Sequence, residues 1–178
     1  MKRFLSQIPM YILWLLLSVM IWGWIFTRLT DAAPEDKVVL FVEAYGVEDT
    51  ALAGVLTPPP GLKMVQVHPF SYAVFDENTI LNADLFVVRE SAAAQYLDSF
   101  QPIDPPEGAA CYESGGVCYG IRVYDAAAHS GAAAAYIQYE APGETPEDYY
   151  LFFGSRSLHA GERDMAAWDV ARQMMEVP

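Results

Sequence analysis

Seven residues that are suited to holding a small ligand follow three apolar segments of the chain. The aromatic ones offer rings on which a ligand could stack, and the others offer an imidazole, two hydroxyls and a guanidinium for hydrogen bonds. These candidate binding residues are Tyr45, His68, Phe70, Ser71, Tyr72, Arg89 and Ser91. A structural role is the alternative: Arg89 would pair with Glu43 or Glu90, and the aromatic rings would cap a sheet. The sequence leaves both interpretations open.

No motif in the chain is typical of an enzyme. Residues 154–158, Gly-Ser-Arg-Ser-Leu, do not form a nucleophile elbow, because that motif needs a glycine two residues on either side of the serine. Phosphate-binding, dinucleotide-binding and zinc-protease motifs are absent from the sequence. His68, His129 and His159 lie far apart, and their spacing does not support a metal site. We therefore expect no catalytic residue, metal or cofactor, with an extracellular hydrolase as the weaker alternative.

The candidate binding residues fall where three expected strands end. Residues 37–45, 62–68 and 84–89 are rich in Val, Leu and Phe, and the continuous apolar runs in the first and third indicate strands buried on both faces. Helical segments are expected at 47–56 and 91–100. This alternation predicts an α/β domain of three layers with a mostly parallel sheet. Ligands bind such a sheet outside the carboxyl ends of its strands.

The second half of the chain follows a different pattern. Strands are expected at 117–124, 136–140 and 149–154, and a closing helix at 164–176. The last two strands would form a hairpin or be joined by a longer crossing, because the segment between them, APGETPED, is rich in turn residues. The Ala-rich residues 126–135 would form either a short helix or a close-packed connection.

The first 30 residues differ from the rest in polarity. No charged residue occurs in the run from Phe4 to Thr27, which as a helix would be about 36 Å long and would cross a hydrocarbon core of about 30 Å. We expect a transmembrane anchor at 1–30, a short stalk at 31–36 and one domain at 37–178. A cleaved signal peptide is the alternative, although the residues after the run match a cleavage site poorly.

Charge is distributed unevenly on the two sides of the apolar run. Lys2 and Arg3 precede it, whereas all 23 acidic residues and seven of the ten basic ones lie at or after Asp31, which gives that part a formal charge of −16. The positive-inside rule then places the N-terminus in the cytoplasm and residues 31–178 outside the cell membrane, as a single-pass protein. Such an acidic domain is a poor partner for nucleic acid, because phosphate groups need a basic surface.

Cys111 and Cys118 are the two cysteines of the chain. Six residues separate them, and Gly115-Gly116 would let the chain turn back, so an oxidising compartment would favour a small disulfide loop. Free thiols are the alternative. A zinc or redox site is disfavoured, because both the C-x-x-C spacing and a second pair of cysteines are lacking.

Three early segments carry a resemblance to a known family. KVVLFVEAYGVEDTALAGVL, GLKMVQVHPFSY and ILNADLFVVRESAAAQYLDSFQPID resemble the first lobe of bacterial extracellular solute-binding proteins of ABC importers. YGIRVYD is similar to the family's YGIPV strand, with Arg122 where proline is usual. The segment from Tyr149 onward resembles the return of the chain to the first lobe. Members of this family are much longer and close two lobes around a ligand.

The chain departs from that family in size. Too few residues lie between Asp125 and Tyr149 to build a second lobe, and no cysteine suited to a lipid anchor follows the apolar run. The resemblance therefore implies one lobe that does not enclose a ligand by hinge closure. We expect a membrane-anchored binding domain that recognises a membrane-protein partner or a small solute. The alternative is a small-molecule receptor or transport accessory that completes its pocket by dimerising.

Overall fold

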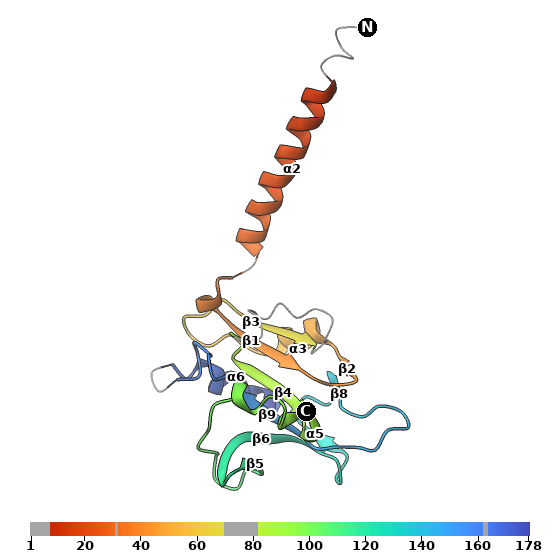
Figure 1. Ribbon diagram of the computed structural model, residues 1–178, viewed down its shortest axis with the longest axis vertical. Helices are drawn as coiled ribbons and strands as arrows, with labels where there is room; N and C mark the ends of the chain where they lie inside the picture. The colour runs from red at the N-terminus through yellow and green to blue at the C-terminus, as the bar shows by residue number, and fades with distance from the viewer. Residues whose placement is uncertain (1–7, 31, 70–81, 162–163) are drawn as a thin grey trace. The chain divides into compact units, whose positions relative to one another are not determined.

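A long apolar helix, α2 (Ile8–Thr30), forms the N-terminal part of the computed structural model (Figure 1). The stretch Ile8–Phe26 has a mean hydropathy of 1.9, is long enough to cross a membrane, and has none of its residues buried. A helix of this length and apolarity could cross a membrane, and a signal sequence near the N-terminus has the same length and composition.

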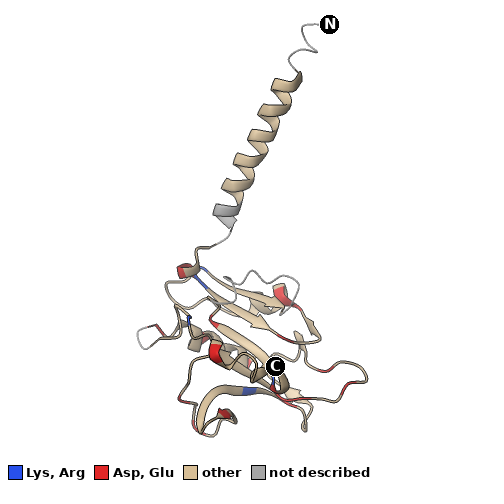
Figure 2. Ribbon diagram, in the orientation of Figure 1, with Lys and Arg blue, Asp and Glu red and all other residues tan. Residues whose placement is uncertain are grey.

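The structure describes residues 8–30, 32–69, 82–161 and 164–178. The chain divides into two compact units, Met1–Ala33 and Pro34–Pro178, and the division falls inside the expected stalk. In the second unit, which we call the domain, acidic side chains far outnumber basic ones (Figure 2).

The main sheet of the domain has seven strands. In spatial order they are β3 (Met64–Pro69), β1 (Lys37–Val42), β4 (Leu85–Arg89), β9 (Tyr149–Phe153), β6 (Val117–Asp125) and β5 (Cys111–Ser114), with β7 (Ser130–Gly131) paired to β6. A separate ribbon pairs β2 (Gly46–Val47) with β8 (Ile137–Gln138). The helical segments are η1 (Pro34–Asp36), α3 (Asp49–Val55), α5 (Glu90–Ala93), η2 (Leu97–Ser99) and α6 (Ala166–Glu176).

The domain is α/β as expected, but its sheet is mixed rather than mostly parallel. β1 runs parallel to both β3 and β4, whereas β9, β6 and β5 join the sheet by antiparallel pairings. Parallel pairing of β6 and β9 would need a crossover, usually a helix. Residues 126–148, all of which the structure describes, contain turns and short strands but no helix.

Two connections were expected between 136–140 and 149–154. The hairpin is wrong, and the longer crossing is correct. β8 pairs with β2, while β9 inserts between β4 and β6. Every residue of β9 is buried, so this strand belongs in the middle of a sheet. The Ala-rich segment 126–135 is not a helix: it contains β7, and both His129 and Ala133 have positive φ angles, which interrupt a helix. Most of its residues are exposed, so it is a connection at the surface.

Core residues pack on both faces of the sheet, with unequal helical cover. Leu40, Leu85 and Leu151 face a large core that includes residues of α3 and α6. The alternate residues Phe86 and Phe152 face a smaller core that includes the alanines of α5. Among the described residues, the smaller core has little helix over it, and the expected three-layer arrangement is not confirmed.

The helix expected at 91–100 is much shorter than predicted. α5 ends at Ala93, and η2 and an extended residue follow. Phe100 forms an isolated β-bridge with Gly154 and stacks on Phe152 with ring centroids 4.2 Å apart. Burial of this aromatic ring outweighs helix propensity, which is worth less than about 1 kcal/mol per residue.

Cys111 and Cys118 form a disulfide across the β5–β6 hairpin, with their Cα atoms 5.9 Å apart. The turn contains Gly115 and Gly116, whose φ angles are +62° and +79°. Two consecutive positive φ angles suit the tightest hairpin turns and favour glycine at both positions. The expected disulfide loop is therefore present in the structure.

Candidate functional site

The carboxyl ends of β1 and β4 lie side by side, and an ion pair joins them. Arg89 Nε donates to Glu43 Oε1 at 3.0 Å, and Glu43 is only 5% exposed. Burial by itself lowers the pKa of Arg89, but the charge and hydrogen bond of Glu43 raise it above its ordinary value. The guanidinium is therefore already engaged by a carboxylate of the chain, as one of the two interpretations proposed.

A second set of carboxylates closes the same edge from the segment before β9. The backbone N–H of Ser91 donates to Glu147 Oε2 at 3.2 Å, and that of Glu90 donates to the Asp148 carbonyl at 2.9 Å. The Asp148 carboxylate also accepts from Arg122 at 3.1 Å. A carboxylate ligand that bound to these donors would have to displace acceptors of the protein itself, both side-chain carboxylates and the Asp148 carbonyl.

The remaining candidate binding residues are dispersed. Tyr45 follows β1 and is 62% exposed, whereas His68 is half-buried on β3, with its ring 5.4 Å from that of Phe41. Phe70, Ser71 and Tyr72 lie outside the described residues. The residues that follow the carboxyl ends of β1 and β4, with the carboxylate bound to one of them, are together called the carboxyl rim: Tyr45, Glu90, Ser91 and Glu147.

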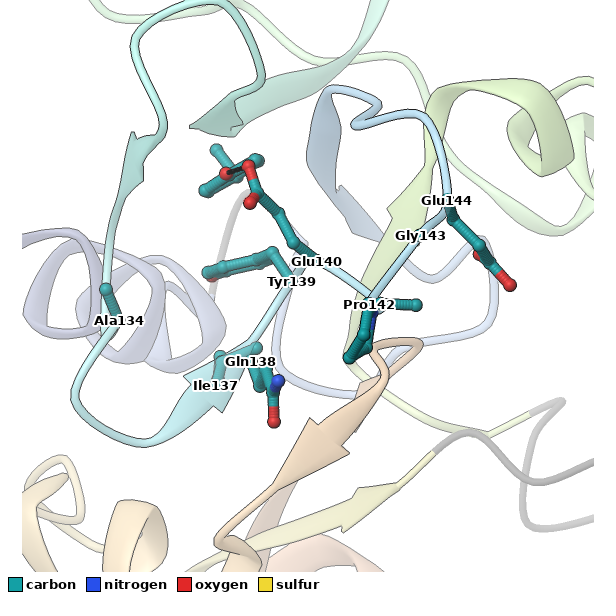
Figure 3. Close-up of a pocket in the computed structure, with 10 residues that line it drawn as sticks. Ala134, Ile137, Gln138, Tyr139, Glu140, Pro142, Gly143 and Glu144 are labelled. Atoms are coloured by element: carbon teal, nitrogen blue, oxygen red, sulfur yellow. Dashed lines mark hydrogen bonds between the residues drawn. The ribbon is translucent and has the colours of Figure 1, made fainter.

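An open cavity of about 510 Å³ lies in the region that follows β7, where sequence spacing gave no signal (Figure 3). Its lining residues are Tyr124, Ala134, Ile137, Gln138, Tyr139, Glu140, Ala141, Pro142, Gly143 and Glu144. The lining includes two carboxylates and no basic side chain. Glu140 and Glu144 point in different directions from the loop (Figure 3).

The wall of this cavity is a cluster of hydrogen-bonded tyrosines. The rings of Tyr124 and Tyr139 stack at 4.5 Å, and the Tyr149 hydroxyl donates to the Tyr139 carbonyl at 2.9 Å. The Tyr124 hydroxyl donates to the Glu140 carboxylate, which also lies 2.5 Å from His129 Nδ1. Burial and Glu140 together raise the pKa of Tyr124 to about 12, so this hydroxyl stays protonated and acts as a donor.

A serine, a histidine and two aspartates gather at the opposite edge, near the amino ends of β1 and β4. We call Asp84, Ser157, His159 and Asp164 the amino cluster. The Ser157 hydroxyl donates to Asp84 Oδ1 at 2.5 Å and accepts from the His159 backbone N–H at 3.0 Å. Asp84 Oδ2 accepts from the Val39 backbone N–H at 2.9 Å.

The amino cluster has the residue types of a catalytic triad but a different geometry. An activated serine needs a general base within hydrogen-bond reach of its hydroxyl. Here the hydroxyl faces Asp84, while the ring nitrogens of His159 lie 2.8 Å from Asp164 Oδ2 and 3.3 Å from the Pro34 carbonyl oxygen. Burial raises the pKa of Asp84, although Ser157, Val39 and His159 oppose this shift. The geometry indicates a structural network.

No group of three or more metal-binding side chains gathers within the described parts of the chain. The chain was compared with family models, curated proteins and solved structures, and none of them matches it.

Proposed function

We propose that this chain is a non-enzymatic binding domain, anchored in the cell membrane by α2 and exposed outside the cytoplasm, that recognises a partner protein through its carboxyl rim. Two features support the location. Basic residues precede the apolar run and acidic ones follow it, and the Cys111–Cys118 disulfide is of a kind that persists in oxidising compartments.

The single observation that favours a protein partner is that the rim's own donors are already occupied. Arg89 and the N–H of Ser91 are engaged by Glu43 and Glu147. What the rim offers to a partner is an exposed tyrosine, Tyr45, together with the carboxylates of Glu90 and Glu147. Tyrosine is enriched at protein interfaces, and the acidic surroundings favour a partner with a basic face.

The resemblance to one lobe of a solute-binding protein is compatible with this proposal. The parallel strands β3, β1 and β4, followed by the return of β9 to the same sheet, fit the expected single lobe. The open cavity supports the second candidate function, a small-molecule receptor that completes its pocket by dimerising. Its volume of about 510 Å³ suits a small ligand, but its open side would need a cover.

A site-specific photo-cross-linker tests the proposal in the full chain, in membranes of the native host. Replacing Tyr45 by a photoreactive phenylalanine should yield a discrete adduct with another protein. The same replacement of Arg156, which is exposed next to the amino cluster, is the matched control and should yield none. An adduct with the mass of two copies of the chain would favour the dimeric receptor. Failure of external protease to reach the domain in spheroplasts would contradict the proposed location.

A further inference from the structure

The imidazole of His159 is enclosed near the point where the chain enters the domain. The residue is 4% exposed, and its two ring nitrogens face two acceptors: Nδ1 lies 2.8 Å from Asp164 Oδ2 and Nε2 lies 3.3 Å from the carbonyl oxygen of Pro34. Pro34 opens η1, directly before β1. Both contacts can be hydrogen bonds only if both ring nitrogens carry a proton, since neutral imidazole has one N–H.

The charges that face this imidazole are both negative. Asp164 contacts it directly, and Asp84 acts on it from the start of β4. On the neighbouring elements, Asp36 of η1 pairs with Lys63 at 2.6 Å, and Asp169 of α6 lies 3.6 Å from Arg172.

We propose that His159 and Asp164 form a protonation-dependent clamp that holds Pro34 and thereby fixes the entry of the chain into the domain. In the protonated state, the imidazolium donates to both acceptors. Loss of one proton leaves a single N–H, which stays with the charged Asp164 carboxylate because hydrogen bonds to ionised groups are the stronger ones. The Pro34 carbonyl then loses its donor, and the entry segment loosens.

The direction of the pH effect follows from the surroundings of the ring. Burial lowers the pKa of His159, but the hydrogen bonds to Asp164 and Pro34 and the charge of Asp84 raise it above the ordinary value of 6.5. The stabilisation is therefore fully present below that ordinary value and is lost as pH rises through the folded-state pKa. On the acid side, burial raises the pKa of Asp164, but His159 and the Ala166 N–H lower it overall, so the carboxylate stays charged to lower pH.

Hydrogen exchange and a histidine titration test the clamp in the full chain in detergent micelles. From about pH 5 to about pH 9, amides in residues 35–38 should lose protection against exchange, after correction for base-catalysed exchange. The loss should be about tenfold for each unit by which folding raises the pKa of His159. His159→Gln keeps one donor and cannot titrate, so its protection should be low and independent of pH. His129→Gln removes an exposed histidine and should behave like the wild type.

Two results would overturn the proposal. One is a His159 ring, identified in NMR spectra by its absence from His159→Gln, that titrates at or below the ordinary value. The other is the same pH dependence at residues 35–38 in the wild type and in His159→Gln. Should His159→Gln fail to fold, Asp164→Asn keeps an acceptor without the charge, and its protection must fall at lower pH than in the wild type. An unchanged profile in Asp164→Asn would equally contradict the clamp.

Discussion

Each edge of the parallel strands carries a buried carboxylate, but the two carboxylates lie in different surroundings. At the amino edge, Asp84 is 2% exposed and is bonded to Ser157 and to the Val39 backbone. At the carboxyl edge, Glu43 is equally enclosed, but its partner Arg89 has a side chain that is 38% exposed. A polar group without water must be satisfied by the protein, whereas a partly wet one can exchange partners. The amino edge is therefore suited to holding the fold, and the carboxyl edge to meeting another molecule.

The largest loss of stability is expected from Asp84→Ala. It leaves the Ser157 hydroxyl and the Val39 N–H without their acceptor in the interior. Each unsatisfied buried group costs about 1–3 kcal/mol, so the free energy of unfolding should fall by about 3–4 kcal/mol. Urea unfolding of the full chain in micelles measures this. Asp84→Asn keeps one acceptor oxygen and should cost less, and equal losses in both variants would show that the hydrogen bonds are not the cause.

Removal of the disulfide should lower the free energy of unfolding without changing either edge, so this variant serves as a control for the comparison. Cys111→Ser with Cys118→Ser opens a loop of eight residues, for which chain entropy predicts a loss of about 2.5 kcal/mol. No titrating group takes part, so the loss should be the same across pH when unfolding is measured against the oxidised wild type. A loss that varied with pH would mean that the hairpin is coupled to one of the two edges.

Arg89→Met should destabilise the carboxyl edge by about 2 kcal/mol. It leaves the enclosed Glu43 carboxylate without its guanidinium, and the cost stays below that of a fully buried pair because water reaches the position of Arg89. Adding Glu43→Gln to Arg89→Met should recover about half of the loss, because the unpaired charge is removed. A double-mutant cycle from urea unfolding measures the coupling, and a coupling near zero would mean that the two residues act independently.

The difference between the edges also explains what the sequence could predict. Continuous apolar runs identified β1 and β4, and residues 62–68 were also expected as the strand that became β3. The candidate binding residues were taken from the ends of these strands. The pairing of Arg89 with Glu43 was foreseeable as one of two alternatives, because both residues end neighbouring strands. The position of β9 was not, since the run from Tyr149 to Phe153 indicates burial but does not specify its neighbours.

The amino cluster was beyond prediction from local patterns. Ser157 lies 73 residues from Asp84, and His159 lies 125 residues from Pro34, so only the completed sheet brings them together. Its residues also stand in loops, where hydrophobic periodicity carries no signal. The cavity formed by residues 134–144 was missed for a similar reason, because its shape depends on the pairing of β8 with β2.

The smallest effect on stability, and the sharpest test of the comparison, is expected from Tyr45→Ala. The side chain is mostly exposed, so the free energy of unfolding should change by less than about 0.5 kcal/mol. If the carboxyl rim carries the interface, the same change should weaken binding of the cross-linked partner by about tenfold or more, as truncation of a tyrosine hot spot does. Leu158→Ala is the matched control, because Leu158 is 57% exposed beside the amino cluster. Binding of the purified partner to each full-chain variant in micelles decides between the edges: equal affinities for the two variants would remove the functional distinction between them.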